Sequence, residues 1–120
     1  MLWRIDPSID EPLYSQIVAQ VYTAILNGEI GLGERLPAAR NLAEGLGLNM
    51  HTVLRAYGEL RDEGIIALKR GRGAVVVAGK PHGADIAQVR AALTAFAEAV
   101  RKAGLTPGIA TTMVRQEFAK

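Results

Sequence analysis

The stretch PAARNLAEGLGLNMHTVLRAYGELRDEG, residues 37–64, decides the fold of this chain. Apolar residues recur in it at helical spacing on both sides of a short break, Gly47-Leu48-Asn49. Gly47 is a typical helix stop and Asn49 a good N-cap, so the pattern predicts two short helices joined by a tight turn, the first opening at Pro37. This is a helix-turn-helix. The expected inward residues are Ala39, Leu42, Ala43 and Leu46 in the first helix, and Val53, Ala56, Tyr57 and Leu60 in the second.

The residues that follow this pair predict a β-hairpin. Two β-rich runs, IIALK (65–69) and AVVVA (74–78), flank the glycine-containing turn RGRG (70–73). Such a pattern is typical of two antiparallel strands. A hairpin directly after the second helix of a helix-turn-helix is a wing.

The preceding residues predict one more helix and a loop. Apolar side chains recur at four-residue intervals after Pro12, which favours a helix of about 15 residues that Gly28 ends. The glycines of GEIGLGERLP (28–37) interrupt this periodicity and indicate a loop, with a short strand expected over residues 34–36.

The last third of the chain predicts a helical hairpin. GKPHG (79–83) has the composition of a linker. A final helix begins at Pro107 with Thr106 as its cap, and its apolar residues Ile109, Met113, Val114 and Phe118 are expected to point inward. The helix before it carries an apolar stripe with alternating spacings of three and four, formed by Ile86, Val89, Leu93, Phe96, Val100 and Ala103.

The expected fold class is therefore mainly α with a small β-hairpin (α+β). A winged helix-turn-helix domain, residues 1–79, precedes a two-helix tail, residues 80–120. Two amphipathic helices leave one apolar side uncovered, so the tail is expected to form a homodimer through Ile86, Val89, Leu93, Phe96 and Val100.

Composition narrows the possible functions. The chain has 120 residues and no cysteine, which excludes disulfides, zinc–cysteine sites, iron–sulfur clusters and thiol nucleophiles. Two histidines are few for a catalytic metal site, so we expect no metal and no cofactor. No apolar run is long enough to span a membrane and the first residues do not resemble a signal peptide, so a cytoplasmic protein is expected.

The distribution of charge favours an anionic partner for the middle of the chain. The net charge is only +2, but residues 37–80 carry seven basic and four acidic side chains, whereas residues 1–36 are acidic overall. Double-stranded DNA is such a partner.

The outward face of the second helix carries candidate DNA contacts. His51 and Arg55 lie there with Gly58 and Asp62, opposite the apolar face. An arginine at this position suits guanine O6 and N7 in the major groove. The alternative is an ordinary solvated helix face, with Arg55 paired to Glu59.

Two other groups of basic residues suit phosphates. Arg70, Gly71 and Arg72 form the tip of the predicted wing, where arginines reach phosphates or the minor groove. Arg40 stands at the start of the first helix of the pair, beside free backbone N–H groups. The alternatives are a solvated turn and an ion pair between Arg40 and Glu44.

These residues resemble the DNA-binding domain of the GntR family of bacterial transcription regulators. The resemblance covers residues 11–78, from PLYSQIVAQVYTAILNGEI through GERLPAARNLAEGLGL and NMHTVLRAYGELRDEGII to RGRGAVVV. The short two-helix tail is similar to that of the YtrA-like subfamily. The resemblance implies DNA contacts at the arginine of LP-x-x-R, at the start of the recognition helix and at the wing tip, which here are Arg40, Asn49, His51, Thr52 and Gly71.

Two residues depart from the family pattern. Met50 stands where many members have arginine and YtrA-like ones often proline, and Ala38 replaces a frequent serine. One base contact and one hydroxyl contact are therefore missing, so the operator sequence cannot be inferred from relatives.

The predicted function is a sequence-specific DNA-binding regulator, a repressor that binds a palindromic operator as a homodimer. It is not expected to be an enzyme. A small-molecule effector is expected to be absent or to bind between subunits, because a two-helix tail leaves little room for a cavity. The alternatives are a winged-helix protein–protein module without DNA binding, and a small-ligand or enzyme module that uses Asp6, Asp10 and Glu11.

Overall fold

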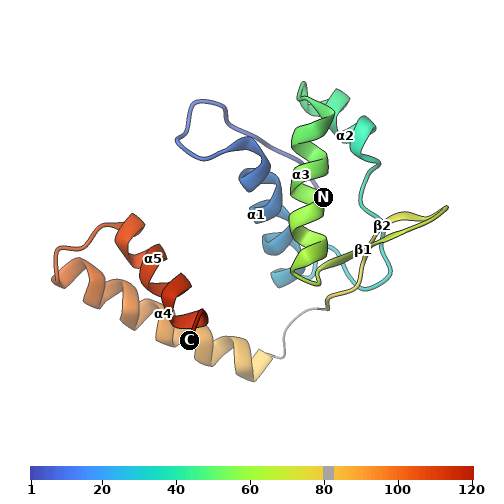
Figure 1. Cartoon of the computed structure of the whole chain (residues 1–120). Helices are drawn as coiled ribbons and strands as arrows, with labels where there is room; N and C mark the ends of the chain where they lie inside the picture. Colours follow the sequence, from blue (N-terminus) through green and yellow to red (C-terminus); the bar gives the residue numbers. More distant parts are fainter. Residues whose placement is uncertain (80–82) are drawn as a thin grey trace. The chain divides into compact units, whose positions relative to one another are not determined.

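The computed structural model describes residues 1–79 and 83–120, and it divides into two compact units, one ending at Lys80 and one beginning at Pro81 (Figure 1). Residues 80–82 of the predicted linker lie outside the described residues. The elements of the first unit are α1 (Leu13–Leu26), α2 (Ala39–Leu46), α3 (Met50–Asp62), β1 (Ile66–Lys69) and β2 (Gly73–Val76). Those of the second unit are α4 (Gly83–Lys102) and α5 (Pro107–Phe118). The predicted fold class, mainly helical with one hairpin, is confirmed.

The turn between α2 and α3 has the predicted local structure. Gly47 adopts the left-handed conformation, with φ of 69°, and ends α2. The Asn49 side chain accepts a hydrogen bond of 2.8 Å from the His51 N–H and so caps α3. The helix α2 begins two residues later than predicted, because Ala38 keeps an extended conformation as its N-cap.

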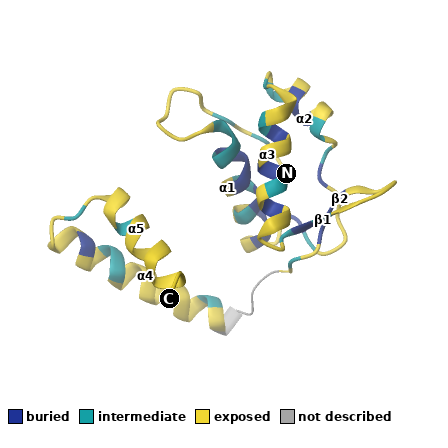
Figure 2. Ribbon diagram, in the orientation of Figure 1, coloured by how far each residue is buried: buried dark blue, intermediate teal, exposed yellow. Residues whose placement is uncertain are grey.

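The core of the first unit lies against the inner face of α3. Val53, Ala56 and Leu60 of that face are completely buried. α3 packs against α1 and α2, and buried residues of these helices are dark blue in Figure 2. The predicted inward face of α3 is therefore confirmed. Ile17 and Val21 of α1 are equally inaccessible to water.

The wing is an antiparallel pair in which Ile66 lies opposite Val76 and Lys69 opposite Gly73. The segment before α2 runs along the free edge of β2. Its backbone forms hydrogen bonds of 2.9 Å from Leu36 N–H to the Ala74 carbonyl and 2.8 Å from Val76 N–H to the Glu34 carbonyl. The predicted short strand at residues 34–36 is reduced to a single bridge at Arg35.

Two glutamines attach the N-terminal segment to α1. The buried Gln16 amide accepts from the Asp6 N–H at 2.7 Å and donates to the carbonyls of Asp6 and Glu11, both at 3.0 Å. One turn later, Gln20 accepts from the Arg4 N–H at 2.8 Å and donates to the Arg4 carbonyl. These hydrogen bonds hold residues 4–6 against α1.

The second unit consists of α4 and α5 joined by a short turn at Gly104. Thr106 caps α5, accepting a hydrogen bond of 3.2 Å from the Ile109 N–H, as predicted. Val100 is the one buried apolar residue among the side chains described in this unit. No helix in the described part of the chain is long and apolar enough to cross a membrane.

The prediction that the apolar residues of α5 point inward is wrong for the single chain. No residue of α5 is buried, and Phe118 is 87% exposed. The physical reason is that two helices make a thin layer, in which each helix can cover only one side of the other. The exposed residues of α5 are Ile109, Met113, Val114 and Phe118.

Two glycines of the helix-turn-helix should respond oppositely to alanine. Gly58 lies inside α3, and a methyl group there would meet only the end of the Arg61 side chain at 3.9 Å. We expect Gly58→Ala to raise the free energy of unfolding by about 0.5–1 kcal/mol. Gly47→Ala should lower it by about 1–2 kcal/mol, because the left-handed conformation strains any residue with a Cβ. Thermal unfolding followed by circular dichroism compares the two, and changes of equal sign would contradict this account.

Tyr57 should make the unfolding free energy depend on alkaline pH. Its buried hydroxyl donates a 2.6 Å hydrogen bond to the Pro37 carbonyl, and burial raises its pKa above the ordinary value of 10.0. Because the folded-state pKa is the higher one, the unfolded chain loses this proton first as pH rises. The contribution of this group is complete below about pH 10 and declines above it.

Tyr57→Phe removes both the hydrogen bond to the Pro37 carbonyl and the titrating hydroxyl. At neutral pH it should lower the unfolding free energy by about 0.5–1.5 kcal/mol, the usual net value of a hydrogen bond. Between about pH 9 and 11 its stability should fall less steeply than that of the unmodified protein, as chemical denaturation can measure. Tyr22, whose pKa is also raised by partial burial and by Glu63 and Glu59, remains in both proteins and supplies the common background. If the unfolding free energies of the two proteins fall equally steeply with pH, titration of Tyr57 does not contribute.

Candidate nucleic-acid interface

The N-terminal half of α3 presents polar side chains to solvent. Packing of Val53, Ala56 and Leu60 into the core turns the opposite side of the helix outward. His51 and Arg55 are exposed there, and Thr52 is half-buried. Asn49, also exposed, uses its side-chain oxygen for the helix cap, which leaves its amide N–H groups for an outside acceptor. The predicted contacts of this helix are thus accessible, and their role in binding stays a prediction.

Apolar side chains interrupt this polar surface. Leu54 is 45% exposed and Met50 36% exposed, both on the same helix. A leucine on the outward side of α3 can contact the methyl group of thymine, the apolar feature of the major groove. Leu54 was not among the DNA contacts predicted from the sequence.

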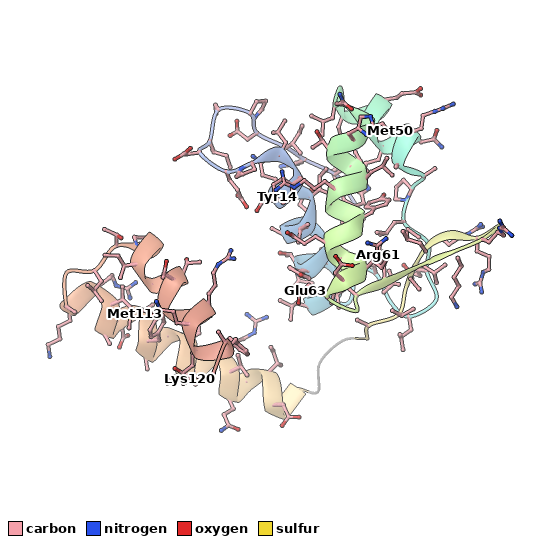
Figure 3. The ribbon with its side chains drawn as sticks, viewed as in Figure 1. Tyr14, Met50, Arg61, Glu63, Met113 and Lys120 are labelled. Atoms are coloured by element: carbon pink, nitrogen blue, oxygen red, sulfur yellow. The ribbon has the colours of Figure 1, made fainter. Side chains whose placement is uncertain are left out.

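Arg55 has a partner that the sequence did not indicate. Its guanidinium carbon lies 3.7 Å from the centre of the Tyr14 ring. Tyr14 lies at the start of α1 (Figure 3). The expected alternative, an ion pair between Arg55 and Glu59, does not occur in the described residues. The sequence could not indicate this contact, because no local pattern links Tyr14 to a residue on another helix.

Arg40 is exposed in the first turn of α2. The alternative ion pair with Glu44 is likewise not formed within the parts of the chain that the structure describes, where the two ion pairs are Arg61–Asp62 and Lys120–Glu117. The guanidinium of Arg40 is therefore available to an anion beside the unpaired N–H groups of the helix start.

The wing carries its charge at an exposed tip. The Arg72 N–H donates a 3.0 Å hydrogen bond to the Lys69 carbonyl, and Gly71 has a positive φ of 79°, which closes the turn between β1 and β2. Lys69, Arg70 and Arg72 are exposed on a hairpin that projects away from the helices of its unit (Figure 1). Such a tip can reach a DNA backbone beside the groove that α3 would occupy.

Two carboxylates of the N-terminal segment, Asp6 and Glu11, accept local hydrogen bonds. Asp6 accepts hydrogen bonds from the Ser8 N–H at 2.9 Å and the Ser8 hydroxyl at 2.5 Å, and these bonds lower its pKa. Glu11 accepts from the Ser15 hydroxyl at 3.1 Å. No group of three potential metal ligands occurs among the described residues.

A helix-turn-helix that exposes Arg40, His51 and Arg55, followed by a charged two-stranded wing, is typical of a winged helix-turn-helix transcription regulator. The model of the family described as "Bacterial regulatory proteins, gntR family" matches residues 13–76. The chain belongs to this family, as its motifs indicated.

Individual relatives place it near the YtrA-like regulators. The HTH-type transcriptional repressor YtrA of Bacillus subtilis is 42% identical over 73 residues, which cover 61% of this chain and 56% of that protein. The HTH-type transcriptional regulator Rv1152 of Mycobacterium tuberculosis is 34% identical over 86% of this chain and 83% of its own length. The structure of YtrA from Sulfolobus acidocaldarius, a GntR-family transcription factor, superposes with a TM-score of 0.59 at 36% identity, covering 76% of this chain and 94% of that one.

The wing tip should contribute affinity without sequence preference. Replacing both Arg70 and Arg72 by alanine is expected to weaken binding to all duplexes by a similar factor. The slope of log affinity against log salt concentration should fall by about one unit for each phosphate that the variant no longer binds. A double substitution in the second unit, Arg90→Ala with Arg115→Ala, removes the same charge from exposed helix surfaces and serves as the control. An unchanged slope in the wing variant would exclude the wing from the binding surface.

Proposed function

We propose that this protein is a transcriptional repressor that binds a palindromic DNA operator as a homodimer in the cytoplasm. The observation that carries the DNA-binding part is the N-terminal half of the outward side of α3, where His51 and Arg55 are exposed and Arg55 forms no ion pair in the described residues. An exposed arginine without an acidic partner suits the phosphate-rich surface around a major groove.

Repression is supported by relatives rather than by geometry. The YtrA relative is named a repressor, and it shares the helix-turn-helix region with this chain. A DNA-binding regulator can repress by occupying a promoter. The matched region spans about half of that relative's length, so the signal that releases repression is not implied by it.

The dimer is supported by the apolar surface of the second unit. Val89 and Leu93 of α4 are each 59% exposed, although both belong to the apolar stripe. A hollow of about 330 Å³ lies between α4 and α5, and its lining includes Leu93, Val100 and Val114. A surface of this kind is too apolar to remain in water, and a second copy of the same hairpin covers it with matching chemistry.

A two-fold dimer would bind a palindromic operator. The two copies of α3 would be related by the same axis as two DNA half-sites, spaced by one helical turn or a multiple of it. Each single domain then needs only modest affinity, because the linked second domain binds at high effective concentration.

Sites for an effector follow from the same arrangement. The hollow between α4 and α5 is open and apolar, and a second copy would share or close it. We therefore propose the dimer interface as the site of any small-molecule effector.

The rival function, a protein–protein module without DNA binding, predicts no salt-dependent retention of any duplex.

Selection from a random duplex library tests the whole proposal. The full chain should enrich an inverted repeat and should run as a dimer in sedimentation. Leu93→Glu, which adds a charge to the apolar surface, should give a folded monomer whose affinity for the selected duplex is lower by orders of magnitude.

The control for this test is Gln88→Glu. It adds the same charge to an exposed polar position of α4 and should change neither assembly nor affinity. A Leu93→Glu variant that remains dimeric and binds normally would show that the second unit is not the dimerisation element. If the unmodified protein enriches no sequence, sequence-specific DNA binding is rejected.

A further inference from the structure

The stacked pair Tyr14–Arg55 joins two helices at the edge of the candidate interface. The guanidinium carbon of Arg55 lies 3.7 Å from the centre of the Tyr14 ring. The ring itself is fixed, because Tyr14 is half-buried and packs against the hydrophobic core. Arg55 is exposed and would otherwise sample many rotamers, so the stack restricts where its charge lies.

The stack displaces the guanidinium from the centre of the outward face of α3. The flank of α3 that carries Arg55 and Glu59 faces α1, since α3 packs against α1 and Arg55 stacks on Tyr14 of that helix. Arg55 precedes Glu59 by one helical turn and leans toward the same neighbour. Leu54 lies on the other side of the outward face, away from this flank.

This displacement determines what Arg55 can reach on DNA. A helix in the major groove turns the centre of its outward face toward base edges and its flanks toward the sugar–phosphate backbones. Arg55, held on the flank toward α1, is directed at a backbone. The ring covers one flat face of the guanidinium and leaves its N–H edge free, the edge that binds a phosphate through two parallel hydrogen bonds.

We propose that Tyr14 is a positioning residue that holds Arg55 as a clamp for a backbone phosphate. The inference rests on the proposed DNA-binding function and revises the guanine contact expected from the sequence. Arg55 then contributes affinity to every duplex, and base preference near this point of the helix is left to other side chains, Leu54 among them.

The first test separates a phosphate contact from a base contact. Arg55→Ala should weaken binding to the selected duplex and to a scrambled duplex alike, by about tenfold per subunit. It should also reduce the salt slope by about one unit per subunit and leave the selected sequence unchanged. The matched control is Arg61→Ala, an exposed arginine of the same helix that pairs with Asp62 at 3.2 Å and should leave the slope unchanged.

The second test isolates the role of Tyr14 by a double-mutant cycle. Tyr14→Phe retains the ring and should bind DNA as the unmodified protein does. Tyr14→Leu should weaken binding roughly two- to fivefold per subunit, the effect of removing an exposed cation–π interaction. In the Arg55→Ala background the same leucine substitution should have no further effect, which a purely structural role of Tyr14 would not produce.

Each other outcome overturns the proposal. Loss of preference at one base pair in Arg55→Ala, with the salt slope intact, would make Arg55 a base reader. An equal effect of Tyr14→Leu in both backgrounds would make Tyr14 structural only. Failure of the DNA-binding function is recognised separately, because the unmodified protein would then retain no duplex.

A further variant covers the case in which Tyr14→Leu does not fold. Arg55→Lys is a surface substitution that keeps the charge and removes the flat face. It should keep the salt slope of the unmodified protein while weakening binding roughly two- to fivefold per subunit. If Arg55→Lys binds DNA as tightly as the unmodified protein, the Tyr14–Arg55 stack does not contribute to DNA affinity.

Discussion

The burial of one side of α3 is the constraint on which the rest of the first unit depends. Val53, Ala56 and Leu60 are completely inaccessible to water, and they meet α1 on one side and α2 on the other. Because the helix has about 3.6 residues per turn, fixing this side also fixes which residues face outward. Burial of Val53 and of Leu60 contributes about 1.5–3 kcal/mol each, so rotation of α3 about its axis is strongly disfavoured. The orientation of the candidate contacts thus follows from the core.

Smaller interactions set the position of α3 relative to its neighbours. The Tyr57 hydroxyl reaches the Pro37 carbonyl just before α2, and the left-handed Gly47 turns the chain between the two helices. On the opposite flank, Tyr14 stacks on Arg55. The backbone leading into α2 also pairs with β2, so the wing and the helix-turn-helix share one continuous framework.

The second unit obeys a different physical rule. In the first unit three helices and a hairpin enclose a common core, whereas α4 and α5 alone leave most of their apolar residues in contact with water. A layer of two helices has no third element to cover its sides. In the proposed dimer a second copy of the hairpin would cover these sides, and its two-fold symmetry would match a palindromic operator.

Local patterns in the sequence determined much of this molecule. Periodicity located the helices, the cap at Asn49 and the glycine stop at Gly47 set the turn, and the RGRG tip located the wing, because each depends on residues close together in the chain. Tertiary structure alone decided the rest. The Tyr14–Arg55 stack and the glutamine-held N-terminal segment join residues distant in sequence. The exposure of α5 had the same origin: periodicity shows that a helix has an apolar side, but only packing decides whether the same chain can cover it.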